Sequence, residues 1–591
     1  MERKINKKPY LKGVAEDLLT LWKLSTSRRR KQFLALIVFS LLNTLAELAS
    51  IGSVIPFLIL FSNPSKINEY PFVISVLNFF TNFFPNFNFF QIFTFFFIFL
   101  IIFSSILRLF FLRLSLMISY SSASDLSLKI YKNIINQPYA YHLKLKTSSI
   151  ITALTNKINV VAFHIIQSVF VSISSFLIVF GFLIGIFLYN PYIASFLLAF
   201  FIIFYFSIGF IFQNKLIKNS FDIERLLDRL VKLVQESLGS IKEIILGNLQ
   251  QGLIDHYMQL DKSMRNVQSY NSFIGSAPRI LIESIGVIVL LSLAFFLNQS
   301  GQAITEFLPI LGLIIYSSQK VLPSIHSLFS AWSNIKGEQA TLRNVIKLLE
   351  NNDFKFKHNY EDHEDLKFNY QIKFKNISFS YENSSAIILD KINITIKKGS
   401  KVAILGASGS GKSTFVNILM ALQKPSIGEI FVDSQLLTGD RIYNWRRKIA
   451  HVPQDVFLLN ASIAENVAFG VPLEKINLGK VSRILNQLGF KDFIETSEKK
   501  LLSEVGERGI NLSGGQRQKI AIARALYRKA SLFVFDEATS SLDTKSQDDI
   551  LKAIFTLPKN ITVIMITHQT ELTRNFDKIY MLKNKNFTQI N

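Results

Sequence analysis

Six long apolar stretches constrain the fold of this chain more than any other feature of its sequence. They lie at about 33–62, 91–119, 160–188, 192–213, 274–298 and 305–326. At about 1.5 Å per residue, each is long enough as a helix to cross a hydrocarbon core of roughly 30 Å. We therefore expect six transmembrane helices, which argues against a nucleic-acid partner despite a formal net charge of +23.

The positive charges beside these stretches are distributed unevenly. Lys and Arg gather at 28–31, 129–146 and 215–232, whereas the alternate loops contain a single lysine, Lys66. Positively charged loops stay on the cytoplasmic side of a membrane. We therefore predict a multi-pass protein of the cell or inner membrane with both termini in the cytoplasm. The chain has no cysteine, which excludes disulfides and thiolate metal sites.

Four regions follow from the composition along the chain. Residues 1–32 contain an amphipathic segment at 11–24, which predicts an elbow helix on the inner membrane surface. Polar residues at helical spacing favour an external interfacial helix at about 70–84 over a poorly ordered loop. The expected regions are the elbow at 1–32, an α-helical polytopic membrane domain at 33–345, a charged linker at 346–370 and an α/β nucleotide-binding domain at 371–591.

The segment KVAILGASGSGKST at 401–414 is a strand that runs into a glycine-rich loop and a helix. It matches the phosphate-loop pattern G-x-x-x-x-G-K-[ST]. Such a loop points backbone N–H groups at phosphate oxygens, and its lysine reaches the β- and γ-phosphates. The predicted nucleotide contacts in this loop are Gly406, Ser408, Gly409, Ser410, Gly411, Lys412, Ser413 and Thr414.

Two adjacent carboxylates end the apolar strand in SLFVFDEATSSLD at 531–543. Asp536 is suited to hold Mg²⁺ together with the Ser413 hydroxyl, and Glu537 is suited to polarise an attacking water. Taken alone, such a pair could be a solvated strand end. The phosphate loop makes the catalytic interpretation stronger.

The segment NLSGGQRQKIAIARAL at 511–526 contains LSGGQ, and through it the region 370–585 resembles the ATPase domain of ABC transporters. That resemblance implies ATP and Mg²⁺ as cofactors, with ATP hydrolysis coupled to transmembrane transport. It implies roles in ATP binding or hydrolysis for further residues, with Gln454 also a ligand of Mg²⁺. These residues are Tyr381, Gln454, Ser513, Gly514, Gly515, Gln516, Asp543 and His568.

The same resemblance implies an assembly. The chain has one phosphate loop and one LSGGQ segment, and in the family each ATP is completed by the signature segment of a second subunit. The six stretches before the ATPase domain resemble a type I (type IV fold) ABC exporter half-transporter. We expect a homodimer, and a heterodimer stays open. The C-terminal tail lacks the glycine that usually follows the last strand, so we expect a trimmed end.

Ionisable residues within the apolar stretches bear on the cargo. The acids are Glu47 and Glu283, and the bases include Arg108, Arg279 and Lys320. One interpretation is that these groups pair internally and stabilise the bundle. The other is that the surplus of bases receives an anionic head-group such as a phosphate or diphosphate.

Three short membrane segments, LLNTLAELASIGSVIPFL, SAPRILIESIG and YSSQKVLPS, resemble those of bacterial lipid-linked oligosaccharide flippases. The resemblance implies substrate-cavity roles for Arg108, Arg279 and Lys320. It also implies a flippase that moves an amphipathic anionic lipid, a polyprenyl-diphosphate-linked oligosaccharide, from the inner to the outer leaflet. The alternatives are a multidrug, general lipid or peptide exporter and, from another class, an ATP-gated channel or regulator.

Overall fold

The computed structural model describes residues 13–62, 87–189, 191–299, 304–350, 366–381, 386–497, 499–538 and 544–590. The chain divides into two compact units, one of residues 1–137 and 145–355 and one of residues 138–144 and 356–591. The first unit is helical and the second is α/β, so the predicted fold class is confirmed. The predicted external helix at 70–84 lies outside the described residues.

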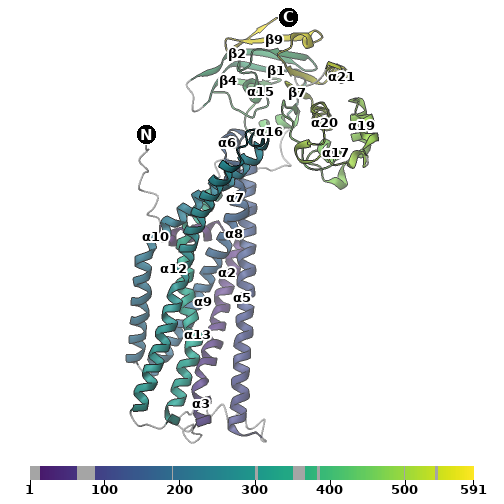
Figure 1. Cartoon of the computed structure of the whole chain (residues 1–591). Helices are drawn as coiled ribbons and strands as arrows, with labels where there is room; N and C mark the ends of the chain where they lie inside the picture. Colours follow the sequence, from purple (N-terminus) through teal and green to yellow (C-terminus); the bar gives the residue numbers. More distant parts are fainter. Residues whose placement is uncertain are drawn as a thin grey trace. The chain divides into compact units, whose positions relative to one another are not determined.

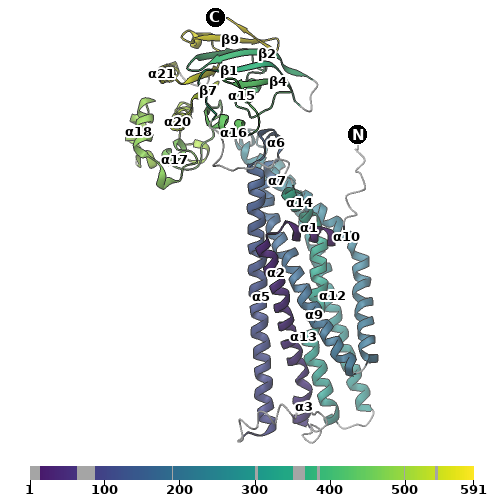
Figure 2. The same ribbon diagram turned by 180° about the vertical axis from the view of Figure 1, so that it is seen from behind.

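Long helices that run side by side make up the first unit (Figures 1 and 2). Its elements are α1 (Val14–Leu24), α2 (Ser27–Gly52), α3 (Val54–Ser62), α5 (Phe89–Ile135), α7 (Thr147–Thr152), η3 (Ala153–Lys157), α8 (Ile158–Val160), η4 (Val161–Ile166), α9 (Gln167–Tyr189), α10 (Pro191–Gly239), α11 (Ile241–Leu246), α12 (Gln250–Gln299), α13 (Ile304–Gly337) and α14 (Gln339–Glu350).

Three helical stretches of the described residues are long and apolar enough to cross a membrane: Ser27–Phe61, Phe89–Ile135 and Thr147–Phe187. The other predicted stretches lie within α10, α12 and α13. Several helices run well past the apolar stretches that predicted them. Helix α5 continues to Ile135, beyond the predicted end at 119, because Leu126, Ile130 and Ile134 keep a buried stripe at helical spacing.

The end of the membrane unit differs from the expected boundary. The predicted linker begins at 346, but helix α14 continues to Glu350. One apolar cluster buries Leu342, Val345 and Leu349, which follow one another at helical spacing. The charged residues between them obscured this pattern in the sequence. Helix α14 also contacts α1, because Asp17 accepts hydrogen bonds from Gln339 Nε2 at 3.0 Å and Arg343 Nε at 2.9 Å.

A buried lysine joins two long helical segments of this unit. The segments η3 and η4 are π-helical turns on either side of α8, within the helical run that leads into α9. Lys157 is the last residue of η3, and only 1% of its side chain is exposed. Its Nζ lies 3.0 Å from Glu224 Oε1 and 3.1 Å from Asp228 Oδ1 of α10. Two carboxylates thus compensate one buried ammonium group.

The second unit is built on two sheets. A four-stranded sheet has the order β2-β1-β4-β5, and a six-stranded sheet has the order β10-β9-β3-β8-β7-β6 with parallel neighbours from β9 to β6. The strands are β1 (Gln371–Ser380), β2 (Ile387–Lys397), β3 (Lys401–Leu405), β4 (Ile427–Val432), β5 (Gln435–Leu436), β6 (Ile449–Val452), β7 (Leu532–Asp536), β8 (Thr562–Ile566), β9 (Lys578–Lys583) and β10 (Asn586–Gln589).

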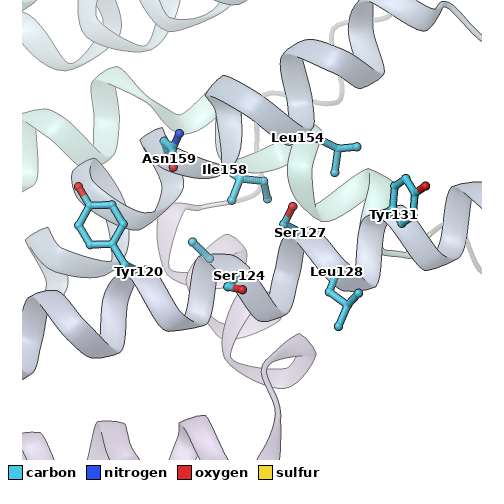
Figure 3. A pocket seen from close by; sticks show the side chains of 9 residues that line it. Tyr120, Ser124, Ser127, Leu128, Tyr131, Leu154, Ile158 and Asn159 are labelled. Carbon is cyan, nitrogen blue, oxygen red and sulfur yellow. The ribbon is translucent and has the colours of Figure 1, made fainter. Parts of the chain in front are cut away.

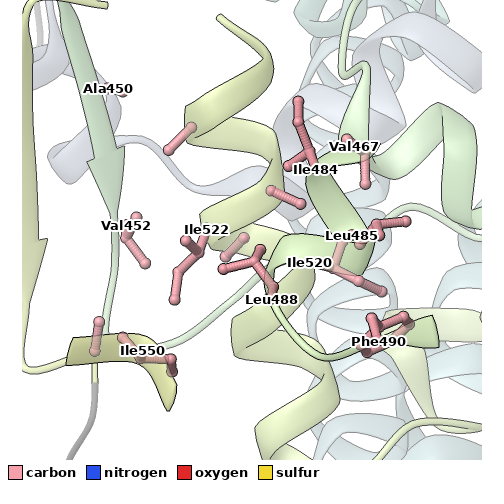
Figure 4. Packing of buried hydrophobic residues seen from close by; sticks show 14 of the residues in the cluster. Ala450, Val452, Val467, Ile484, Leu485, Leu488, Phe490, Ile520, Ile522 and Ile550 are labelled. Carbon is pink, nitrogen blue, oxygen red and sulfur yellow. The ribbon is translucent and has the colours of Figure 1, made fainter. Parts of the chain in front are cut away.

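Helices complete this unit. They are α6 (Tyr139–Lys144), α15 (Lys412–Leu419), α16 (Asp440–Arg447), α17 (Ile463–Val467), α18 (Leu478–Gln487), α19 (Lys491–Thr496), α20 (Gly514–Tyr527) and α21 (Thr544–Phe555), with 3-10 turns η5 (Leu473–Lys475), η6 (Lys500–Leu502), η7 (Glu507–Gly509) and η8 (Thr570–Thr573). One apolar cluster holds α17, α18 and α20 against β6, as Figure 4 shows with Val467, Leu485, Ile520 and Val452.

The C-terminal strands form a hairpin in which β10 pairs antiparallel with β9. The turn between them places Asn584 at φ 51° and Lys585 at φ 66°. These left-handed conformations are the ones that a tight hairpin turn requires and that glycine supplies most easily. Two non-glycine residues therefore make the turn that glycine would make most easily.

Replacing Lys157 by Met should lower the free energy of unfolding by about 3–5 kcal/mol, because the change leaves two carboxylates without their buried partner. Unfolding of the detergent-solubilised protein measures this effect. Lys232→Ala is the matched control, because Lys232 pairs with Glu236 at 3.4 Å on the exposed surface of α10. The control should change stability by less than about 1 kcal/mol. Equal losses in both variants would contradict the structural role of Lys157.

Candidate functional site

The glycine-rich loop connects the end of β3 to the start of α15 and contains two glycines with left-handed backbone angles. Gly409 has φ 77° and Gly411 has φ 104°. A Cβ atom at Gly411 would lie 3.0 Å from Ile388 Cγ2 and 3.1 Å from Leu389 Cδ2. The backbone conformation and the close packing both require glycine at this position.

Lys412 turns back over this loop. Its Nζ donates to the carbonyl oxygens of Gly406 at 2.8 Å and Ala407 at 2.9 Å, and 6% of its side chain is exposed. The buried Ser410 Oγ has no hydrogen-bond partner among the described residues. A buried ammonium group and an orphan hydroxyl on a loop at a helix N-terminus fit the phosphate groups of a nucleotide.

Two predicted catalytic groups contact each other at the end of β7. Gln454 Nε2 donates to Glu537 Oε2 at 3.2 Å, and Glu537 Oε1 lies 3.8 Å from Lys412 Nζ. Glu537 has a left-handed φ of 48°, and its N–H donates to the Ile566 carbonyl of β8 at 3.1 Å. The structure therefore joins Lys412, Gln454 and Glu537, which come from three separate segments of the chain.

Asp536 precedes Glu537 as the last residue of β7. Burial raises the pKa of the Asp536 carboxyl above its ordinary value, the adjacent Glu537 charge raises it further, and Lys412 partly opposes both effects. A divalent cation would favour the ionised form. The oxygen donors of Asp536, Ser413 and Gln454 are of the kind that Mg²⁺ prefers, so these residues fit the ion.

The LSGGQ segment forms the N-terminus of a second helix, α20. Ser513 is its N-cap: its Oγ accepts from Gln516 N at 3.2 Å, while its own N–H donates to Gln516 Oε1 at 2.8 Å. This capping box fixes the first turn. The N–H groups of Gly514 and Gly515 belong to that turn, where no intrahelical acceptor exists. The segment can therefore offer donors to an anion.

The remaining predicted ATP contacts have different environments. The Tyr381 ring is 40% exposed and stands edge-on to Phe379 at 5.0 Å between centroids, and its hydroxyl lies 3.3 Å from Thr414 Oγ1. The partly exposed ring suits stacking on a planar base. His568 is exposed just after β8. Asp543 lies outside the described residues.

The five charged residues that the sequence analysis places within the apolar stretches, Glu47, Arg108, Arg279, Glu283 and Lys320, form two groups. Glu47 of α2, with 2% of its side chain exposed, lies 3.7 Å from Arg108 of α5 and 3.9 Å from Lys320 of α13. Arg279 Nε donates to Glu283 Oε1 at 2.7 Å within α12. Glu47 thus brings together two of the three predicted substrate residues, and Arg279 belongs to the second group.

His326 of α13 is a further residue beside the second group, and it was not among the residues predicted from the sequence. This residue lies within electrostatic range of both Arg279 and Glu283, and its Nδ1 has no hydrogen-bond partner among the described residues. Its position at the end of the last apolar stretch was a signal that could have identified it.

A groove of about 490 Å³ also opens in the membrane unit, between α5 and the segment that runs from η3 to α8 (Figure 3). Tyr120, Ser124 and Tyr131 line one wall, and Leu154 and Asn159 line the other. Its lining residues are uncharged, and the predicted substrate residues are not among them. The groove is therefore separate from the two charged groups.

Both units of the chain match known protein families. Residues 33–316 match the family described as ABC transporter transmembrane region, and residues 389–540 match the family described as ABC transporter. A bacterial Atm1-family ABC exporter with ATP bound has a similar structure, with a TM-score of 0.74, 20% sequence identity and 95% of each chain covered. That likeness concerns the fold.

Among curated relatives, an ATP-dependent lipid A-core flippase of Cupriavidus metallidurans is 38% identical over 211 residues. This match spans 36% of our chain and 36% of the relative, little more than a third of its length. A flippase of the same name from Paraburkholderia xenovorans is 28% identical over 478 residues, with 78% of our chain and 76% of the relative covered.

Gly411→Ala should destabilise the α/β unit by more than about 1 kcal/mol and abolish nucleotide binding, because the new Cβ is strained at this φ and contacts β2. Thermal unfolding and binding of a fluorescent ATP analogue measure the two effects. Gly479→Ala in α18 is the control, because its Cβ would have only an ordinary contact of 3.5 Å with Asn477. Normal nucleotide binding by Gly411→Ala would show that the loop does not need this conformation.

Proposed function

We propose that this chain is an ATP-driven exporter of lipids. The premise is that it carries the transmembrane region and the ATPase domain of the ABC transporter family. The family resemblance predicted from the LSGGQ segment is confirmed. The single observation that carries the proposal is the junction of Lys412, Gln454 and Glu537, since a channel or regulator that does not turn over ATP would not need a general base beside the phosphate lysine.

In this proposal the ATP phosphates replace the carbonyl oxygens of Gly406 and Ala407 as acceptors for Lys412. Glu537 accepts a hydrogen bond from the attacking water and acts as its general base. The Gln454 amide holds the Glu537 carboxylate in place. His568 orients the γ-phosphate from the end of β8. Mg²⁺, when held by Ser413, Gln454 and Asp536, supplies positive charge to the β- and γ-phosphate oxygens.

A second copy of the chain completes each ATP site in our proposal. The loop at 406–414 binds ATP on one subunit, and Ser513, Gly515 and the α20 N-terminus of the other subunit cap the γ-phosphate. A two-fold homodimer is the simplest assembly that has two complete sites. ATP binding would close the two ATPase domains, which lie in the cytoplasm with both termini. Hydrolysis would reset the membrane domain.

The charged groups of the membrane unit favour an anionic lipid as the cargo. Two carboxylates, Glu47 and Glu283, face three bases, Arg108, Arg279 and Lys320, so each subunit keeps a positive surplus within this set. A phosphate or diphosphate head-group would compensate it, whereas a neutral drug would not. We therefore propose a polyprenyl-diphosphate-linked oligosaccharide as the substrate, moved from the inner to the outer leaflet.

Glu537→Gln should abolish steady-state ATP hydrolysis while ATP binding persists, because the amide cannot act as the base but keeps the shape of the side chain. The activity of the purified protein in nanodiscs and the retention of labelled ATP measure the two properties. Glu571→Gln, in the turn after β8, is a control in the same domain and should keep wild-type activity. Undiminished hydrolysis by Glu537→Gln would remove this residue from the mechanism.

Arg279→Ala should slow the flipping of a fluorescent lipid-diphosphate oligosaccharide roughly tenfold or more, because a hydrogen bond to a charged group contributes about 1.5–3 kcal/mol. The assay uses proteoliposomes with ATP. Arg265→Ala is matched to it, because Arg265 also lies on α12 and pairs with an acid four residues away, Asp261, at 3.3 Å. Equal flipping by wild type and Arg279→Ala would return Arg279 to a structural role.

A further inference from the structure

Glu47 holds its two bases in a different way from Glu224, another acid of the membrane unit that pairs with a base. Its contacts with Arg108 and Lys320, at 3.7 Å and 3.9 Å, are ion pairs too long for hydrogen bonds. The buried Glu47 Oε1 has no hydrogen-bond partner among the described residues. By contrast, Lys157 donates a hydrogen bond to Glu224 at 3.0 Å.

The exposure of the three side chains is also unequal. Glu47 is 2% exposed, Lys320 is 18% exposed and Arg108 is 60% exposed. The acid is therefore fixed among packed helices, while at least one of its bases can reach a ligand. An arginine that keeps its donors unsatisfied by its counter-ion is ready to bind an anion with stronger, charge-assisted hydrogen bonds.

The three residues come from α2, α5 and α13, and the packing between these helices keeps them in reach of one another. An anion that drew Arg108 and Lys320 towards itself would leave Glu47 as a buried charge without compensation, which is unfavourable. The acid would therefore oppose tight binding of the anion and would attract the bases again when the anion leaves.

We propose that Glu47 is a positioning residue that acts as a displaceable counter-ion for Arg108 and Lys320, and that it sets how tightly the transporter holds a phosphate-bearing lipid head-group. This inference rests on the proposed transport of an anionic lipid. Glu47 does not bind the head-group. When no head-group is bound, Glu47 attracts the two bases. This attraction lowers their affinity for the head-group and so permits its release.

The test measures ATP hydrolysis by the full-length protein in phosphatidylcholine nanodiscs as farnesyl diphosphate is added. Farnesyl monophosphate and farnesol are the comparison probes. Glu47→Gln removes the negative charge at nearly constant volume. We expect the half-stimulating concentration of farnesyl diphosphate to fall about tenfold, because neither base is then compensated, and the maximal stimulated rate to fall as well, because release slows.

Glu47→Asp keeps the charge and should keep the half-stimulating concentration within about twofold of wild type. Glu236→Gln is the control for loss of an ion-paired acid elsewhere, since Glu236 pairs with Lys232 on the exposed surface of α10. It should match wild type. A purely structural role for Glu47 would instead lower the melting temperature and the maximal rate without tightening the response to the diphosphate.

The outcomes separate this inference from the proposed function. If the wild type does not respond to farnesyl diphosphate beyond farnesol, the proposed anionic cargo is wrong. If the wild type responds and Glu47→Gln responds at the same or a higher concentration, the cargo class stands and the counter-ion role of Glu47 is wrong. A response to monophosphate and diphosphate alike would assign the site to phosphate-bearing lipids in general.

Discussion

The absence of water from the hydrocarbon core of a membrane governs most of this structure. Backbone groups there must be paired within the protein, so the apolar stretches fold as helices. Charges there must be compensated, and among the described residues Glu47 lies against Arg108 and Lys320, while Arg279 pairs with Glu283. Where the acids do not neutralise all the bases, the remaining positive charge in this water-free environment favours binding of an anion.

The α/β unit has a different constraint: its charged side chains must already lie close together before a ligand binds. In the sheet, β3 and β7 lie on either side of β8 and run parallel to it, so the phosphate loop and the Asp536–Glu537 pair lie at the same, carboxyl-terminal edge of the strands. Ligands of open α/β sheets bind at this edge. The long-range contacts of Glu537 with Gln454 and Lys412 follow from that topology rather than from any local preference.

Sequence patterns predicted the fold class, and they indicated which segments form the candidate ATP site, because both depend on local signals. Apolar length indicated the membrane helices, and glycine, lysine and carboxylates at fixed spacing indicated the phosphate loop and β7. Element ends were less predictable. The extension of α14 past 346 depends on packing against other helices, and the Asn584–Lys585 turn depends on the strand pairing around it. The shared contact of Glu47 with two bases joins residues far apart in sequence, which no local pattern encodes.

The hydrogen bonds that Asp17 accepts from Gln339 and Arg343 connect the beginning of the described chain to its last membrane-unit helix. The two ends of the membrane unit are thereby fastened to each other, although more than three hundred residues separate them. Removal of α1 would leave Gln339 and Arg343 of α14 without this acceptor, so the damage would appear at the opposite end of the sequence from the deletion.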